Sequence, residues 1–225
     1  LLEVTRDTEK LVREAQAEVD KAKETLTIKA QALKKVRVAA APKLCDAVTE
    51  QMSHLQMGSA QIELNFEDLP FEQWNKVGST KIELMYKPSA QMTARPLRKI
   101  ASGGEVSRVM LACKVVLGES DVCDTLVFDE VDAGVGGATA VALAEVLAQL
   151  AKTHQVIVVT HLPQVAVMAS KQYVVSKTEE HNALPVTSLT EVSGTQREEE
   201  IARMLSGSIT EASLAHAHEL LSEVR

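Results

Sequence analysis

Three short polar segments carry the side chains best suited to chemistry, and each adjoins a hydrophobic element. The first, residues 100–105, reads IASGGE and lies directly before an amphipathic stretch. Its two glycines let the backbone come close to a bound group, and its serine can cap the following helix. Free N–H groups and the positive helix end attract anions, so the segment suits a phosphate. The plainer alternative is a simple turn without a ligand.

The second segment places two adjacent carboxylates at the end of a hydrophobic run. Residues 125–130 read TLVFDE, which predicts a buried strand followed by Asp129 and Glu130. Ligands in open α/β sheets bind at the carboxyl ends of strands. One carboxylate can hold Mg²⁺ through its hydration shell, while the other polarises an attacking water. An acidic strand end at a solvated turn is the alternative interpretation.

The third segment repeats this arrangement with a histidine. Residues 156–161 read VIVVTH, a second buried strand that ends at His161. Its imidazole can donate a hydrogen bond to a phosphate oxygen. A histidine at a strand end is also common as a structural residue.

A long helical segment precedes these three. Residues 1–40 contain neither Gly nor Pro, and their apolar side chains recur mostly at steps of three and four. This imperfect heptad predicts one strand of a coiled coil, with an amphipathic helix packed on a core as the alternative. We expect Pro42 to kink or restart the helix and Gly58 to mark its end.

The segments between and after them predict a mixed α/β fold. Apolar runs joined by helices indicate a parallel sheet covered on both faces. The remaining elements are expected as antiparallel strands at 62–66 and 82–86, a loop at 87–99, helices at 106–117, 138–151, 196–205 and 210–224, and a hairpin within 172–192.

Composition excludes several classes of protein. The net charge of −7 gives no global attraction to DNA, so DNA contacts would need a local patch or another part of the protein. Aromatic residues make up 3% of the chain, too few for a base-stacking platform. Three cysteines without a CxxC pair fit a reducing cytoplasm, and no apolar run is long enough for a membrane helix. Since the chain opens at Leu1 inside a helical pattern, we expect it to be a piece of a longer protein.

In this order along the chain, the three segments resemble the signature loop, the Walker B strand and the switch histidine of the ABC ATPase superfamily. Residues 131–134 (VDAG) fall where that superfamily has its D-loop. The sequence LRKIASGGEVSR at 97–108 looks like that of the SMC-related ATPases. THLPQVA at 160–166 and IARML at 201–205 are similar to the RecN-type DNA repair ATPases. Residues 87–95 match no family pattern.

The resemblance implies roles for individual residues. Ser102, Gly103, Gly104 and Glu105 would form the signature loop and contact ATP held by an opposing head. Asp129 would organise Mg²⁺ through water, Glu130 would activate the attacking water, and His161 would stabilise the transferred phosphoryl group. Asp132 would link the two sites across the dimer interface.

The resemblance also implies an architecture. Residues 1–57 would be the returning coiled-coil helix, and residues 58–225 the C-terminal lobe of an ABC-type head. No G-x-x-x-x-G-K-[ST] occurs, so the phosphate-cradling Walker A loop would come from an N-terminal half of the same head. We expect a homodimer joined through its heads and no ATPase activity from this chain alone.

The function implied is ATP-dependent DNA double-strand-break repair in the cytoplasm at the nucleoid, with hydrolysis coupled to DNA engagement. Two alternatives remain: a chromosome-organising SMC head with a much longer arm, and a structural clamp that binds ATP with negligible turnover. A clamp has no need of a base at Glu130.

Overall fold

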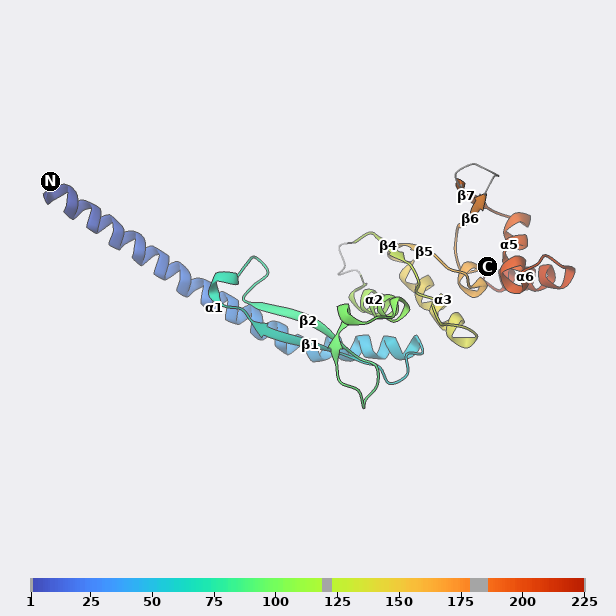
Figure 1. Ribbon diagram of the computed structural model, residues 1–225, viewed down its shortest axis with the longest axis horizontal. Helices are drawn as coiled ribbons and strands as arrows, with labels where there is room; N and C mark the ends of the chain where they lie inside the picture. The colour runs from blue at the N-terminus through green and yellow to red at the C-terminus, as the bar shows by residue number, and fades with distance from the viewer. Residues whose placement is uncertain (1, 119–122, 179–185, 225) are drawn as a thin grey trace. The chain divides into compact units, whose positions relative to one another are not determined.

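The computed structural model describes residues 2–118, 123–178 and 186–224 (Figure 1). The elements in chain order are α1 Leu2–His54, β1 Gln61–Asp68, η1 Phe71–Gln73, β2 Thr80–Lys87, β3 Arg95–Pro96, η2 Leu97–Lys99, α2 Gly103–Leu117, β4 Thr125–Phe128, α3 Ala138–Leu150, β5 Gln155–Val158, α4 Pro163–Ala166, β6 Gln172–Thr178, β7 Val186–Val192, α5 Thr195–Ser206 and α6 Glu211–Glu223.

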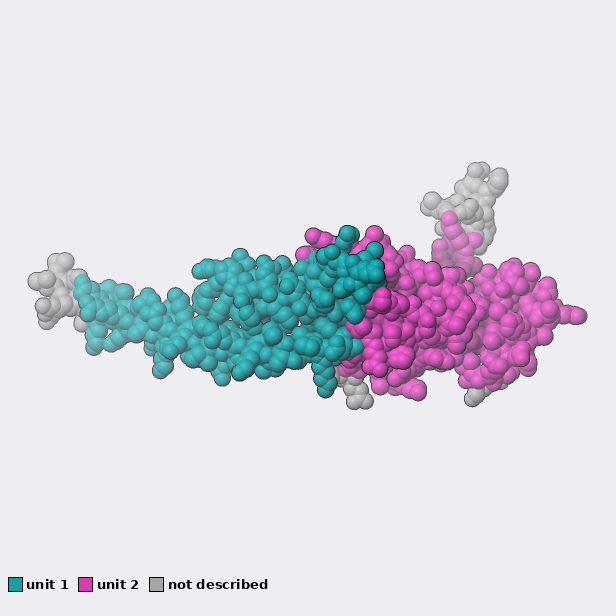
Figure 2. Space-filling view, turned by 90° about the horizontal axis from the view of Figure 1, so that it is seen from below, with its two compact units in different colours: residues 1–46, 61–96 teal, residues 47–60, 97–225 magenta. Residues whose placement is uncertain are grey.

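Contacts divide the chain into two compact units, residues 1–46 with 61–96, and residues 47–60 with 97–225 (Figure 2). This division differs from the sequence-based boundary at residue 58, because the β1–β2 hairpin belongs to the same unit as most of α1. Hydrophobic periodicity gives the extent of a helix but does not reveal which later strands pack against it.

Helix α1 runs for 53 residues and contains Pro42 in its interior. The expectation that the helix restarts at this proline is wrong. A proline removes one backbone hydrogen bond, and the buried side chains Ala41, Cys45 and Val48 keep helical spacing on either side of it. The helix ends at His54, shortly before Gly58 with its φ of 64°. Among the described residues, no helix combines the length and apolar character that a membrane crossing requires.

The first unit is a hairpin packed on α1. Strands β1 and β2 pair antiparallel, with Ile62 opposite Tyr86 and Leu64 opposite Leu84, as the alternating pattern predicts. Ile62 and Tyr86 are buried, whereas Ile82 farther along the hairpin is 39% exposed. The two-residue β3 extends this sheet and was not foreseen, since two residues carry no detectable periodicity.

Polar contacts fasten the hairpin to α1. Lys34 Nζ lies 2.6 Å from Asp68 Oδ2, and Arg37 Nη1 donates to the Val77 carbonyl at 2.7 Å. A side chain at Gly78 would meet Arg37 and Leu33 at 3.2 Å, so glycine permits this close approach. The hairpin is therefore held to the helix mainly at its far end.

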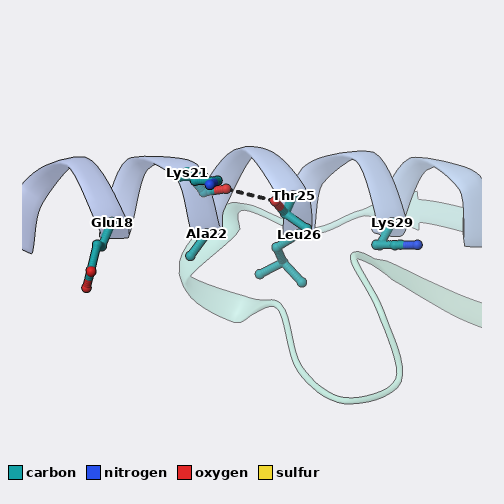
Figure 3. Close-up of a pocket in the computed structure, with 6 residues that line it drawn as sticks. All are labelled: Glu18, Lys21, Ala22, Thr25, Leu26 and Lys29. Atoms are coloured by element: carbon teal, nitrogen blue, oxygen red, sulfur yellow. Dashed lines mark hydrogen bonds between the residues drawn. The ribbon is translucent and has the colours of Figure 1, made fainter.

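A shallow hollow follows one face of α1 within this unit (Figure 3). It is lined at helical spacing by Glu18, Lys21, Ala22, Thr25, Leu26 and Lys29. Thr25 Oγ1 donates to the Lys21 carbonyl at 2.9 Å, so its hydroxyl is used within the helix. Leu26 belongs to the predicted coiled-coil seam, and its side chain is 47% exposed.

The second unit contains the predicted parallel pair. β4 and β5 pair with Leu126 opposite Val156 and Phe128 opposite Val158, and α3 connects them, as parallel strands require. Leu126 and Phe128 are buried. The buried face of α3 has helical spacing and consists of Ala140, Leu143, Ala144, Val146, Leu147 and Leu150.

The opposite face of this parallel pair is uncovered. Val127, Ile157 and Val159 are 65%, 47% and 57% exposed. The expectation of a sheet covered on both faces is therefore wrong for the described residues. The apolar run correctly predicted strands, but periodicity does not determine whether the packing layer belongs to the same segment.

The last elements form a ribbon and a helix pair. β6 and β7 make the expected antiparallel hairpin, whose connection lies outside the described residues. α5 and α6 pack around the buried side chains Ile201, Ala202 and Ala217. Both were predicted from their apolar spacing, whereas the single-turn α4 was too short to detect.

The three cysteines differ in their surroundings. Cys45 is buried, and this burial raises the pKa of its thiol, with Asp46 and Glu63 adding to the shift and a backbone hydrogen bond near Leu64 opposing it. Cys123 is exposed, Cys113 is intermediate, and none of the three is in a disulfide.

Thiol alkylation tests this difference. At pH 8 we expect Cys45 to react at least about ten times more slowly than Cys123. The thiolate is the reactive form, and the raised pKa of Cys45 lowers the fraction of this thiol that is ionised. Mass spectrometry of the chain after timed maleimide treatment measures both rates, and urea should abolish the difference. Equal rates in the folded protein would contradict the burial of Cys45.

Candidate functional site

The first predicted segment forms the N-terminal turn of α2. Ser102 has extended backbone angles, and its Oγ accepts a hydrogen bond from Glu105 N at 3.3 Å. This is the expected helix cap. Ser102 and Gly103 are exposed, and Gly104 is buried. The free end of the helix is thus open to a ligand, while its second glycine is packed inward.

The second segment follows β4, as predicted. Asp129 and Glu130 are both exposed. Glu130 has a φ of 57°, which is uncommon for a residue with a side chain, and its N–H donates to Asp129 Oδ1 at 2.9 Å. Backbone strain of this kind is concentrated at functional sites. Because of this left-handed turn, the Glu130 side chain points in a different direction than it would in an extended strand.

This turn brings the carboxylate of Glu130 to the Ser102–Gly104 turn. A Cβ added to Gly103 would clash with the Glu130 carboxylate. A Cβ added to Gly104 would lie 2.9 Å from Ala133 Cβ and 3.1 Å from the Glu130 carbonyl. Gly104 is therefore required by the approach of the loop after β4, whereas the clash at Gly103 is with the end of an exposed side chain that can move aside.

Asp132 is the buried polar centre of this region, with 3% exposure. Its Oδ2 accepts from Thr160 Oγ1 at 2.5 Å and from His161 N at 3.0 Å, and it lies 3.1 Å from His161 Nδ1. A buried carboxylate is stable only with such donors. Asp132, expected to act across a dimer interface, thus has its carboxylate occupied within its own chain.

These contacts orient the histidine. The His161 side chain is 73% exposed, and its Nδ1 faces the Asp132 carboxylate. If Nδ1 carries a proton toward this carboxylate, Nε2 is the ring atom available to a ligand. Thr160 Oγ1 also accepts from Leu162 N at 3.0 Å and so fixes the backbone on both sides of the histidine.

The structure therefore joins the predicted residues in two contacts. Gly103 meets Glu130, and Asp132 meets His161, although these residues lie far apart in the sequence. Asp129 and Glu130 form a pair of carboxylates rather than a closed metal cage. No group of three His, Cys, Asp or Glu side chains suited to a metal ion occurs among the described residues.

Three residues of this region were missed by the sequence reasoning. Thr160 contacts Asp132, Ser107 Oγ donates to the Asp129 carbonyl at 2.8 Å, and Arg108 Nη1 donates to the Val131 and Ala133 carbonyls at 3.2 and 2.9 Å. The available signal was that Arg108 follows Gly104 by one helical turn and so shares its face.

The close packing of Gly104 generates a prediction. Gly104→Ala should lower the free energy of unfolding by about 1–3 kcal/mol, the usual cost of overpacking, because the new methyl group meets backbone atoms. Gly136→Ala is the matched control, since a Cβ there has nothing within 4 Å. Urea unfolding of the full-length protein measures both, and equal stability of the two variants would contradict the close approach.

The chain is similar to known proteins in sequence and in fold. No protein-family model matches the chain. The DNA repair protein RecN of Deinococcus radiodurans is 42% identical over 207 residues, covering 92% of this chain and 36% of that protein. The RecN of Mycobacterium leprae is 40% identical over 229 residues, covering 93% and 38%. The chain spans little more than a third of the length of the curated relatives it matches.

Solved structures give the same result for the fold. The Smc head domain with a coiled coil and joint from Pyrococcus yayanosii has a TM-score of 0.58 at 19% identity, covering 91% of this chain and 36% of that one. The Smc head domain with an extended coiled coil from Pyrococcus furiosus has a TM-score of 0.53 at 20% identity, covering 100% and 47%. The predicted fold class and resemblance are confirmed: the chain is homologous to the C-terminal third of RecN DNA repair proteins and has the mixed α/β fold, with a long N-terminal helix, of the corresponding part of SMC heads.

Proposed function

We propose that the full-length protein is an ATPase of DNA double-strand-break repair, which hydrolyses ATP between two heads and couples hydrolysis to engagement of DNA. The observation that carries this proposal is that Glu130 and His161 follow the paired parallel strands β4 and β5, with His161 held by the buried Asp132. A candidate base and a candidate phosphate ligand thus follow the carboxyl ends of neighbouring strands, and homology to RecN proteins supports the same function.

In this proposal Glu130 orients and activates water, and His161 stabilises charge on the transferred phosphoryl group. Asp129 holds Mg²⁺ through water; a single carboxylate fits, because Mg²⁺ usually keeps several waters and binds substrate phosphates. Ser102, Gly103 and Gly104, with the cap donor Glu105, contact the γ-phosphate of ATP bound to the opposing head. Hydrolysis then depends on dimer assembly, since phosphoryl transfer rests mainly on positioning and electrostatics.

Asp132 has two roles in this proposed mechanism. Its carboxylate orients His161 within one head, and the turn that carries it faces the second site across the interface. The first part is supported by the three donor contacts to Oδ2. The second rests on the resemblance of residues 131–134 to a D-loop.

The N-terminal half of the head is the first partner in this proposal. The printed sequence contains no Walker A loop, so the phosphate cradle must be supplied by another segment. The uncovered apolar face of Val127, Ile157 and Val159 fits a packed layer from that segment. Burial of these side chains would complete a sheet that is covered on both faces.

A second helix is the partner that α1 lacks. Leu11, Val19, Leu26, Leu33 and Val36 lie on the predicted seam, and all are exposed. A coiled coil would bury them against the outgoing helix of the same protein. We keep the division into an arm at 1–57 and a lobe at 58–225 as part of this proposal.

DNA is the proposed macromolecular partner, and the cytoplasm at the nucleoid is the proposed location. With a net charge of −7, DNA contacts have to come from a local basic patch or from the rest of the protein. The similarity to SMC heads favours a chromosome-organising head as the second candidate function. The length of the full coiled coil would separate the two.

The missing Walker A loop predicts that this chain alone does not hydrolyse ATP. Without the loop, the phosphates have no cradle, and Mg²⁺ lacks its Ser/Thr ligand. Adding the separately produced N-terminal half should restore turnover, measured as phosphate release. Metal-dependent hydrolysis that scales with the concentration of this chain alone would contradict the proposal.

Glu130 gives the second test, in the full-length protein. Glu130→Gln keeps the side-chain shape but cannot accept a proton, so kcat should fall by ~10²–10⁴-fold while ATP binding persists. The ATP-bound dimer should accumulate in sedimentation experiments. Glu145→Gln, at an exposed position of α3, is the matched control and should keep the parent rate. Parent turnover in Glu130→Gln would show that this role is wrongly assigned.

A further inference from the structure

Hydrogen bonds to the backbone carbonyls hold the loop after β4 in place. Its carbonyls from residue 129 to residue 133 bond alternately to α2 side chains and to local amides. The carbonyl of Asp129 accepts from Ser107 Oγ, and the carbonyls of Val131 and Ala133 accept from Arg108 Nη1. The carbonyls of Glu130 and Asp132 accept from the backbone N–H groups of Ala133 and Val135.

Arg108 supplies two of these five bonds. Its side chain is half-buried, and one nitrogen donates to the Val131 carbonyl at 3.2 Å and the Ala133 carbonyl at 2.9 Å. The two acceptors flank Asp132, which is buried together with Val131. Val131 is buried, so its carbonyl needs a partner, whereas Ala133 is exposed. Loss of this guanidinium would leave the turn without two of its attachments.

The attachment joins two functional segments. Ser107 and Arg108 lie just after the Ser102–Gly104 turn on the same helix, whereas the loop they hold carries Glu130 and Asp132. The close approach of Gly104 to Ala133 adds a van der Waals contact to the hydrogen bonds. A shift of the first turn of α2 is therefore transmitted to the loop.

We propose that Arg108, assisted by Ser107, is a positioning residue that couples the signature loop to the loop bearing Glu130 and Asp132. This inference rests on the proposed function. In a dimer, the signature loop would meet ATP of the opposing head, while Glu130 and His161 act on ATP of their own head. Arg108 thereby links the occupancy of one ATP site to the geometry of the other.

The chain offers a matched control for this arginine. Arg197 Nη2 donates to the carbonyls of Ala166, Val167 and Ala169 at 3.2, 3.1 and 2.7 Å. It has the same chemistry, since one guanidinium holds several carbonyls of a turn, but it fastens α5 rather than the signature helix. Arg108→Met and Arg197→Met thus remove the same kind of attachment at two places.

The experiment compares Arg108→Met, Arg108→Lys and Arg197→Met in the full-length protein. We measure kcat for Mg-ATP, the dissociation constant for ATP, thermal stability, and hydrogen exchange of residues 130–135 without nucleotide. Arg108→Met should lower kcat by about 10–100-fold with ATP affinity within about twofold of the parent, because misplacement of the reacting groups affects the chemical step.

The other readouts separate positioning from general stability. Hydrogen exchange of residues 130–135 should accelerate in Arg108→Met, and Arg108→Lys should recover part of kcat because it keeps a cation with N–H donors. Arg197→Met should lower the melting temperature and change kcat by less than about twofold.

Several results would overturn the inference. Parent kcat in Arg108→Met would do so, as would unchanged exchange at residues 130–135 or an equal loss of kcat in Arg197→Met. If the parent protein itself hydrolyses no ATP, the proposed function fails, and the catalytic role of Arg108 fails with it. If the parent protein hydrolyses ATP and Arg108→Met has the same kcat as the parent, only the coupling is refuted.

Discussion

The buried carboxylate of Asp132 is the interaction on which the rest of the site depends. It draws in Thr160 Oγ1 and the backbone and ring of His161, and so joins the ends of two parallel strands. Burial makes each of these donors necessary, because a carboxylate without them would be too costly in an apolar surrounding. The orientation of the exposed imidazole follows from a residue that solvent hardly reaches.

The same turn is fixed on its other side by α2. Close packing at Gly104 and the hydrogen bonds of Ser107 and Arg108 leave the loop little freedom. The left-handed φ of Glu130 persists in this setting because the surrounding contacts determine the turn. The strained φ of Glu130, the close packing of Gly104 and the hydrogen bonds to the loop carbonyls thus belong to one arrangement.

Two apolar surfaces of the described chain are exposed. The seam of α1 and one face of the β4–β5 pair are apolar and exposed, while the opposite face of that pair is buried. Large exposed apolar patches in proteins commonly mark interaction sites. The catalytic proposal has the same character, since in it these residues would supply a base, a metal ligand and a signature loop, and another segment the Walker A loop.

The sequence by itself determined most of the elements and the residues proposed for chemistry. Periodicity predicted the long helix and most strands, and the segments at 100–105, 125–130 and 156–161 gave the candidate loops, since these signals are local. Only the tertiary structure decided the burial of Asp132, the left-handed turn at Glu130 and the hydrogen bonds of Arg108. The contacts of Asp132 and Arg108 join residues more than 20 positions apart in the sequence, and the packing that brings those partners together leaves no trace in local spacing.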